Sequence, residues 1–442
     1  MSTHAHTVLE VNAHLHHPDI LIRTAPTQGL SHMSRSRRPL YIRAVSRVND
    51  IGRLIAFLLF EYLLPKRTRS WCFCTWNTPY PHTIDNPRGL FESVKADPTL
   101  VKIILLKSHH TPDESLREGV NVLFVNVESL RGAYLLARSR VIILGYGLSG
   151  LCSFGHHITK RHDIIQLWHG IPLKRIAKLF PAERFWESEC LKYAATICSA
   201  PQDQRFMAAA FAPTPNVWLT GLPRNDLILA RDDLLPRDYR RQLTQLTHRI
   251  AGRRVILYAP TWRDKNNGIY PFSDSELDAL QTFLLGHNAI FAIRAHSNRR
   301  PNEKTDSSAF NHSICFVNDI PDANLLLRIT DVLVTDYSSI YIDFLLTGRP
   351  ILNFTYDLDS YAAERGFLYP LNDAIPDTPF RTFDELLIRL DAALHRGQLD
   401  SVQYTRVRSL FHSHTGSPSA VVARNIAGLH QTPLMHPLAD DT

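Results

Sequence analysis

Two successive series of short apolar runs, alternating with helical stretches, most strongly constrain how this chain can fold. The apolar runs are Trp71–Thr75, Val101–Leu106, Val120–Val125, Val141–Leu144 and Ile164–Trp168, then Val255–Ala259, Ala289–Arg294, Ile314–Val317, Val332–Thr335 and Pro350–Phe354. The helical candidates are Pro87–Ala96, Glu128–Ser139, Ser275–Leu285, Asn324–Ile329, Ser338–Leu346 and Phe383–His395. Strands that are apolar throughout and separated by helices are typical of a parallel sheet covered on both faces. We therefore predict an α/β protein of two Rossmann-like domains facing each other across a cleft.

The length of 442 residues also favours two domains, because one ordinary core does not grow to this size. A polar, charged stretch around 231–241 separates the two series. We place the first domain at 67–215 and the second at 216–410, followed by a C-terminal helix and tail at 411–442. Residues 1–38 are rich in His, Pro, Ser, Thr and Arg without sustained periodicity, so we expect a disordered leader there.

Charge and cysteine content indicate which partners and which redox environment suit the protein. The formal net charge of +7 suits anionic partners such as phosphates or acidic lipids, although it is also ordinary for the surface of two domains. None of the six cysteines forms a CxxC pair, which favours reduced thiols over a disulfide framework. Cys72 and Cys74 alternate along a strand, so we expect both on one buried face.

The segment Leu54–Leu64 is apolar and aromatic, and arginines flank it on both sides. It is shorter than the roughly 18 residues of a spanning helix. Its composition suits a helix at 39–66 that lies in the headgroup region of an anionic membrane. A helix that packs against the first domain would have the same pattern, so both interpretations stay open.

Ligands of open parallel sheets collect beyond the carboxyl ends of the strands, so the residues that follow each strand are informative. His169 and Gly170 follow Ile164–Trp168, with Lys174 nearby. An imidazole in this position suits a general base beside an anion. Most histidines are structural, but this context favours a catalytic role for His169.

Further polar groups follow strands of the second series. Thr261 and Arg263 offer a hydroxyl and a guanidinium to phosphate oxygens after Val255–Ala259. Arg294 and His296 alternate at the end of another strand and point the same way, and a cleft is less costly for them than a core. We predict that His296 donates a hydrogen bond or a proton to a phosphate oxygen.

Two more clusters complete the candidate site. Thr335 leads into Asp336, Ser338 and Ser339, and we expect one of the serines to cap the following helix, whose N-terminus would bind pyrophosphate. A capping serine without a ligand is the alternative. Arg224 and Asn225 follow Gly221 and reach either a phosphate or a domain interface.

Other patterns carry less weight. Asp357 and Asp359 resemble a metal-binding DxD, but capping or surface placement explains them better. The His pairs at 109–110 and 156–157 lack the companions of a zinc site. No GxGxxG or P-loop follows a strand, so a dinucleotide or P-loop function is unsupported. We expect no metal or other cofactor, with Mg²⁺ accompanying a nucleotide left open.

Taken together, these clusters resemble the CDP-glycerol glycerophosphotransferase family, the teichoic-acid primases and polymerases, over roughly residues 70–400. The matching segments are Asp85–Asn86, Gln166–Lys174, Gly221–Asp226, Tyr258–Asp264, Thr335–Ser339, Asp343–Phe344, Arg349–Pro350, Tyr356–Asp357 and Arg365–Phe367. The family's essential histidine pair falls on His169 and His296. Ser297 follows His296 where the family usually has proline.

This resemblance implies a GT-B-like arrangement, peripheral attachment to the cytoplasmic face of the membrane, and transfer of glycerol phosphate from CDP-glycerol to a lipid-linked or polymeric acceptor. The donor would bind Lys174, Arg224, Asn225, Thr261, Arg263, Arg294, Asp336, Ser338 and Ser339, and no nucleic acid would take part. The alternatives are a nucleotide-sugar glycosyltransferase, a nucleotide-sugar 2-epimerase and a non-catalytic partner in capsule assembly. The polyol, and whether one unit or many are added, stay open.

Overall fold

The computed structural model describes residues 40–74, 84–107, 114–180, 185–261, 263, 269–294, 313–396, 402–431 and 434, with side chains from residue 49 onward. The chain divides into two compact units, 1–49 and 50–442, and the second unit holds both sheets. The leader predicted at 1–38 and the histidine pair at 109–110 lie outside the described residues.

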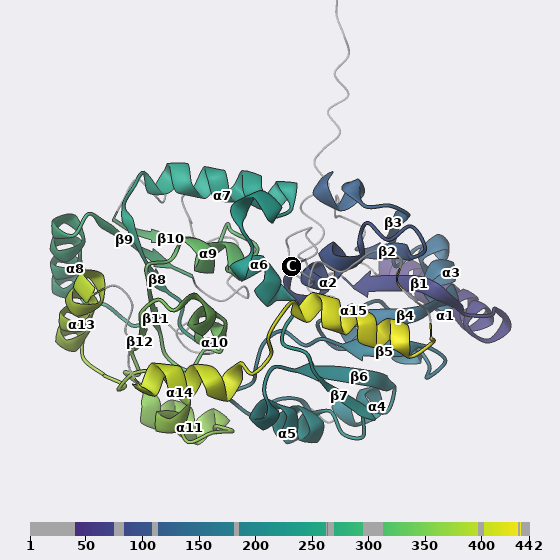
Figure 1. Cartoon of the computed structure of the whole chain (residues 1–442). Helices are drawn as coiled ribbons and strands as arrows, with labels where there is room; N and C mark the ends of the chain where they lie inside the picture. Colours follow the sequence, from purple (N-terminus) through teal and green to yellow (C-terminus); the bar gives the residue numbers. More distant parts are fainter. Residues whose placement is uncertain are drawn as a thin grey trace, which may run out of the picture. The chain divides into compact units, whose positions relative to one another are not determined.

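The first sheet has seven parallel strands in the order β3-β2-β1-β4-β5-β6-β7 (Figure 1). Its strands are β1 (Arg67–Cys74), β2 (Val101–Leu106), β3 (Val122–Asn126), β4 (Ser139–Leu144), β5 (Asp163–Gln166), β6 (Tyr193–Cys198) and β7 (Asn216–Leu219). Helices α2 (Asp85–Val94), α3 (Leu130–Arg138), α4 (Trp186–Cys190) and α5 (Pro201–Ala210) accompany it. The strand β7 pairs with β6, so this sheet continues just beyond the expected range 67–215.

The second sheet has five parallel strands in the order β10-β9-β8-β11-β12. Its strands are β8 (Arg254–Tyr258), β9 (Ala289–Ile293), β10 (Ile314–Phe316), β11 (Val332–Thr335) and β12 (Ile351–Asn353). The helices of this half are α6 (Arg224–Leu229), α7 (Arg237–Ile250), α8 (Asp274–Gly286), α9 (Ala323–Ile329), α10 (Ile340–Phe344), α11 (Leu358–Arg365), α12 (Leu371–Ala374), α13 (Phe383–Arg396) and α14 (Val402–Phe411). Two parallel sheets of this kind form the predicted GT-B-like fold.

The inner strands are buried on both faces, as their apolar composition predicts, whereas the edge strands β3, β7 and β10 are only partly buried. Every residue of β9 is buried, and so are the last five residues of β1 and β2. Cys72 and Cys74 lie together in one core cluster, as expected, and all six cysteines are buried free thiols.

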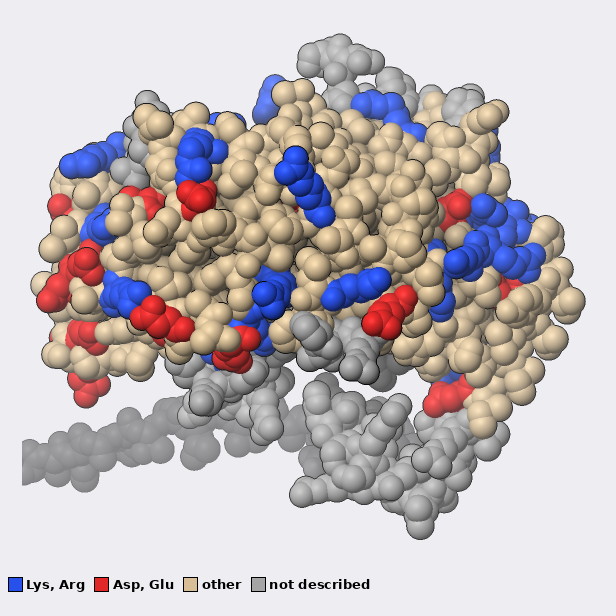
Figure 2. Space-filling model, turned by 90° about the horizontal axis from the view of Figure 1, so that it is seen from below, with Lys and Arg blue, Asp and Glu red and all other residues tan. Residues whose placement is uncertain are grey.

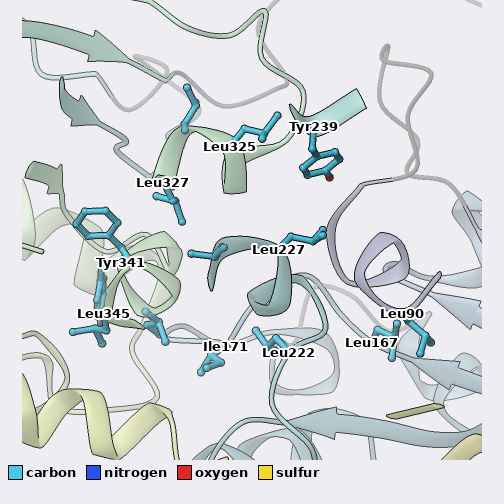
Figure 3. Packing of buried hydrophobic residues seen from close by; sticks show 14 of the residues in the cluster. Leu90, Leu167, Ile171, Leu222, Leu227, Tyr239, Leu325, Leu327, Tyr341 and Leu345 are labelled. Atoms are coloured by element: carbon cyan, nitrogen blue, oxygen red, sulfur yellow. The ribbon is translucent and has the colours of Figure 1, made fainter. Parts of the chain in front are cut away.

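One hydrophobic cluster extends from the first sheet to the second through α6 (Figure 3). Figure 3 shows Leu222 and Leu227 between Leu90 and Leu167 of the first half and Leu325, Leu327 and Tyr341 of the second. A buried ion pair adds to this contact, with Arg88 of α2 donating to Asp238 of α7 at 2.8 Å. The two halves therefore share apolar packing as well as a charged contact.

The C-terminal helix α15 (Pro418–Gly428) packs on α2 and α6 and so returns the chain to the first half. The Asp226 carboxylate accepts hydrogen bonds from the Ser417 hydroxyl at 2.8 Å and from the Ser419 backbone N–H at 3.0 Å. Val422, Ala423 and Ile426 are fully buried in the shared cluster.

The helix α1 (Leu40–Leu63) combines features of both interpretations of this segment. Phe57 is buried and stacks on Phe154 at 4.6 Å, and the buried Glu61 carboxylate accepts from Lys66 at 2.5 Å and pairs with His162. The opposite face exposes apolar side chains, namely Ile51, Ile55, Leu59, Tyr62 and Leu63. No helix in the described part of the chain has both the length and the hydropathy to cross a bilayer.

Candidate active site

Each sheet has a topological switch point, where neighbouring strands connect in opposite directions along the sheet. In the first sheet this point lies between β1 and β4, and in the second between β8 and β11. Ligands of open α/β sheets bind beyond the carboxyl ends of the strands at such points. Tyr146 follows β4 here, Thr261 follows β8, and Asp336 follows β11.

His169 lies beside the first switch point, in the turn after β5. Its ring is stacked on Tyr146, with centroids 4.3 Å apart and planes 10° apart, and the Trp168 ring lies 4.0 Å away on a tilt. His169 Nδ1 is 3.1 Å from the carbonyl oxygen of Gly145. A carbonyl only accepts, so Nδ1 carries the proton, and Nε2 of the neutral ring keeps its lone pair. The site therefore holds the tautomer that a general base needs.

The backbone around His169 is unusual on both sides. Trp168 has φ 51° and Gly170 has φ 144°, and an L side chain rarely adopts either value. A Cβ added at Gly170 would lie 3.0 Å from Arg224 Nη2 and 3.2 Å from the Ser339 hydroxyl. The turn thus brings the His169 segment against Ser339, which belongs to the second half.

Arg224 lies between two carboxylates at this junction. It donates to Asp85 at 3.0 Å, to Asp343 at 2.5 Å and to the backbone carbonyl of His169 at 2.9 Å. Burial raises the pKa of Asp343 to about 6, although Arg224 favours the charged form. The guanidinium therefore supports the main chain of His169. The neighbouring Asn225 has a buried side-chain oxygen with no hydrogen-bond partner among the described residues.

At the second switch point, the buried Asp336 carboxylate accepts hydrogen bonds from residues that follow β8 and β11. It accepts from Thr261 N–H at 2.9 Å, from the Thr261 hydroxyl at 2.7 Å and from Tyr337 N–H at 2.5 Å. It also pairs with Arg263 at 2.6 Å. Thr261, Arg263 and Asp336 are thus brought together, as the sequence predicts.

Arg263 has a second carboxylate partner, Asp357, which it reaches at 2.5 and 2.6 Å. Its guanidinium also lies between 5.1 and 5.5 Å from the ring centres of Tyr337, Tyr356 and Tyr361. Asp357 occupies the N-cap position of α11 without a side-chain capping bond. Of the two placements expected for Asp357 and Asp359, capping is not found at Asp357, whose carboxylate binds Arg263 instead, whereas Asp359 lies on the surface.

Lys174, which follows His169 in the same loop, lies in this second cluster. Its ammonium donates to the Tyr361 hydroxyl at 3.1 Å, and its backbone forms a bridge with Phe367. Burial lowers the pKa of Lys174 to about 8, with Arg365 and Arg263 acting in the same direction and Asp336 opposing them. A cation from the first half thus lies among the groups of the second switch point.

The remaining predicted residues include Ser339, Arg294 and His296, and only the prediction for Ser339 is contradicted. Ser339 is the N-cap residue of α10, but its side chain makes no capping hydrogen bond, so the expected serine cap is wrong. The backbone of Ser339 is αR, whereas a capping residue typically has extended backbone. Arg294 donates to the carbonyls of Ile320 and Pro321 at 2.7 and 3.1 Å. His296 lies outside the described residues.

Sequence reasoning left Tyr146, Asp85 and Asp343 out of the candidate site. Tyr146 is the second residue after β4, so the rule applied to the other strands would have found it. Asp85 and Asp343 lie in two of the short family-like segments, but only the fold shows that both meet Arg224.

Potential metal ligands lie elsewhere. Among the described residues, His287, Asp391 and His395 offer one ligand atom each within 4.8 Å of one another. They belong to the end of α8 and to α13, so neither switch point includes them.

Comparison with known proteins identifies the family. The model of the family described as CDP-Glycerol:Poly(glycerophosphate) glycerophosphotransferase matches residues 57–427. The chain belongs to this family. The match confirms the resemblance carried by the motifs around His169, Thr261 and Asp336.

Curated relatives of this family member include wall-polymer enzymes. The chain is 28% identical over 237 residues to teichoic acid ribitol-phosphate polymerase TarK of Staphylococcus aureus, covering 52% of this chain and 46% of TarK. It is 26% identical over 322 residues to a teichoic acid poly(glycerol phosphate) polymerase of Bacillus spizizenii, covering 68% of this chain and 78% of that protein. The chain spans less than half the length of the ribitol-phosphate polymerases it matches.

A solved structure shares the fold. The wall teichoic acid polymerase TagF aligns with a TM-score of 0.69 and 20% identity, over 88% of this chain and 97% of that chain. This likeness supports the GT-B-like fold of the family member described here.

Proposed function

We propose that this chain is a transferase that moves glycerol phosphate, or a related polyol phosphate, from CDP-glycerol to a hydroxyl of a lipid-linked or polymeric acceptor. CMP is the second product. The observation that carries the proposal is His169, whose Nδ1 donates to Gly145 so that Nε2 is left as a base in the middle of the family motif. The names of the relatives support a polyol phosphate as the transferred group.

In the proposed reaction, His169 Nε2 takes the proton of the acceptor hydroxyl as its oxygen attacks the β-phosphorus of the donor. A new P–O bond forms, and the bond from this phosphorus to the bridging oxygen breaks, so that CMP leaves with the electron pair. Transfer of this kind depends on positioning and on neutralising charge. We assign the acceptor to the first half, 67–215, and the donor to the second, 216–410.

The second switch point supports donor binding. Lys174 and Arg263 are cations beside the Thr261 hydroxyl, and Tyr337 and Tyr361 stack at 4.5 Å beside them. Asp336 and Asp357 neutralise Arg263 here, so we propose that the diphosphate takes their place on the guanidinium. Arg224, Asn225, Arg294, Ser338 and Ser339 stay proposed donor contacts, with His296 assisting the departing phosphate.

We also propose peripheral attachment to an anionic membrane, on its cytoplasmic face. Ile51, Ile55 and Leu59 recur at helical spacing on the exposed face of α1, and such a face suits the headgroup region. Figure 2 supports an anionic partner, because Lys and Arg side chains gather at its right-hand side. The variant Ile55→Glu/Leu59→Glu should lose flotation with phosphatidylglycerol vesicles, while Leu285→Glu, on α8, keeps it. Equal flotation of both would remove the membrane proposal.

The test of the activity is CMP release. Purified full-length protein is incubated with CDP-glycerol or CDP-ribitol, with and without lipid-linked acceptor, and His169→Ala should lower turnover by about 10²–10⁴-fold. Near-normal CMP release by this variant would remove the base role. Release of UDP from a nucleotide sugar, with none of CMP, would favour a glycosyltransferase instead.

A further inference from the structure

A hollow lies beside His169 at the switch point of the first sheet. Its volume is about 240 Å³. It is lined by Cys74, Ile84, Pro87, Leu144, Gly145, Tyr146, Gly147, Ser149, Gly150, Leu151, Phe185 and Trp186. Two of these residues also hold His169, since Gly145 accepts its Nδ1–H and Tyr146 stacks on its ring. A molecule in this hollow would therefore contact residues that hold the base, although His169 itself is not part of the lining.

The lining is aromatic and uncharged. Tyr146, Phe185 and Trp186 contribute rings, Ser149 contributes a hydroxyl, and none of the described lining residues is acidic or basic. A phosphodiester here would lose hydration without gaining a cation, and that is costly. The second switch point, with Lys174 and Arg263, offers what this hollow lacks.

The hollow is also preformed. The buried Glu189 carboxylate accepts the backbone N–H groups of Leu148 at 2.9 Å and Ser149 at 3.0 Å, together with the Tyr193 hydroxyl at 3.0 Å. A Cβ at Gly147 would lie 2.9 Å from this carboxylate and 3.3 Å from the Trp186 ring. The wall after β4 is thus fixed before a ligand arrives, so binding needs little ordering.

We propose that this hollow binds an uncharged glycosyl unit at the reacting end of the acceptor, and that the sugar's hydroxyl meets His169. The volume lies below the roughly 300–1,000 Å³ of pockets for drug-sized ligands, which suits one ring. The flat faces of Phe185 and Trp186 suit the apolar faces of a sugar, and the Ser149 hydroxyl suits its edge. The acceptor is then a sugar-ended carrier rather than a chain of polyol phosphates, so the enzyme adds a first unit. This inference rests on the proposed transfer.

Binding is measured first, without donor. Saturation-transfer NMR of the full-length protein with a panel of neutral methyl hexosides should detect at least one that binds, and a glycerol phosphate trimer should not displace it. Phe185→Ala should weaken this binding about two- to tenfold, the range expected for one aromatic contact. Leu191→Ala is the matched control, because Leu191 is similarly exposed at the other end of α4 and lies outside the lining.

Transfer is measured second. CMP release from the better CDP-polyol is compared for a sugar-ended lipid and for a glycerol phosphate-ended lipid, and the first should be preferred. Ser149→Lys adds a cation at the rim of the hollow and should shift the preference towards the anionic acceptor.

The outcomes separate the two proposals. Preference of the unaltered enzyme for the anionic acceptor, or binding of 1-butanol but of no hexoside, would overturn the glycosyl pocket and leave the transferase intact. Hexoside binding that depends on Phe185, without CMP release from any donor, would uphold the pocket and remove the transferase.

Discussion

At the carboxyl edge of the first sheet, His169 lies between two rings beside an uncharged hollow, whereas at that of the second sheet Arg263 is held between Asp336 and Asp357. The topology of the two edges is the same, because both are switch points of parallel sheets. Their chemistry differs in how charge is arranged. At the first edge a backbone carbonyl sets the tautomer of His169, and at the second edge two carboxylates neutralise Arg263. Under the proposed function, the first edge supplies the proton acceptor and the second the phosphate site.

The largest expected effect comes from removing one of the two carboxylates that bind Arg263 at the edge of the second sheet. Asp336→Asn leaves Arg263 with one carboxylate in a buried place, and losing one partner of a buried pair costs about 3–5 kcal/mol. The free energy of unfolding from denaturant titration should fall by this amount, nearer the lower end because Asp357 remains. Asp357→Asn is the matched control; at 21% side-chain exposure it should cost about 1 kcal/mol or less. Equal losses would show that burial does not separate the two partners.

The next effect tests the turn that joins the edges. Gly170→Ala places a Cβ against Arg224 and Ser339 at a φ that alanine rarely adopts, so His169 should shift. A displacement of about 1 Å can lower turnover by about 10²-fold. CMP release should fall, while calorimetry shows donor affinity within a few-fold of normal. Gly286→Ala, at the end of α8 where a Cβ meets nothing within 4 Å, should retain turnover.

A smaller effect concerns Lys174, whose pKa of about 8 places its titration within reach of assays. As the pH rises through about 8 the ammonium loses its proton, so affinity for the anionic donor should fall, on the order of tenfold for one charge-assisted hydrogen bond. The free energy of unfolding should change in the opposite direction and rise with pH. The unfolded chain binds more protons between this pKa and the normal lysine value, so unfolding becomes less favourable as the pH rises there.

Lys174→Arg provides the comparison for that titration, because a guanidinium keeps its charge across this range. Its donor dissociation constant should stay flat from pH 7 to 9.5, and Lys95→Arg, at the partly exposed C-cap of α2, should behave like the unaltered protein. Parallel profiles for Lys174→Arg and the unaltered protein would assign the titration to another group.

The smallest effect concerns the edge of the first sheet, where Tyr146 stacks on His169. Tyr146→Ala removes the ring stacked on His169, and such contacts contribute about 0.5–1.5 kcal/mol. Turnover should drop severalfold, and Tyr146→Phe should restore it because the ring rather than the hydroxyl supports the imidazole. A drop of the same size in Tyr146→Phe would point to the hydroxyl instead.

Much of the fold could be predicted because a strand in a parallel sheet is apolar throughout. Val101–Leu106 and Val332–Thr335 have the predicted bounds. The strands β6 and β7 were missed because Tyr193–Cys198 is rich in small residues and Asn216–Leu219 is very short. Their pairing with β5 and with each other, rather than a local pattern, makes them strands.

The candidate site was predictable to the extent that it follows the strands. His169, Thr261 and Asp336 each lie within three residues after the end of a strand, and the topology brings Thr261 to Asp336. The partners of the arginines were not predictable, because Asp357 is 94 residues from Arg263 and Asp343 is 119 residues from Arg224. Both pairs lie within the second half and depend on how its strands and helices are arranged, which no local periodicity records.

The return of α15 to the first half has a consequence for synthesis. Leu90 and Phe91 of α2 belong to the same buried cluster as Val422 and Ile426, which leave the ribosome about 200 residues after the first sheet is complete, a delay of roughly 10–40 s. During that interval the first half has its strands but lacks part of its cover, and an apolar surface stays open to chaperones or to neighbouring chains. The last described helix, α15, therefore completes the cover of the first half only when synthesis is almost finished.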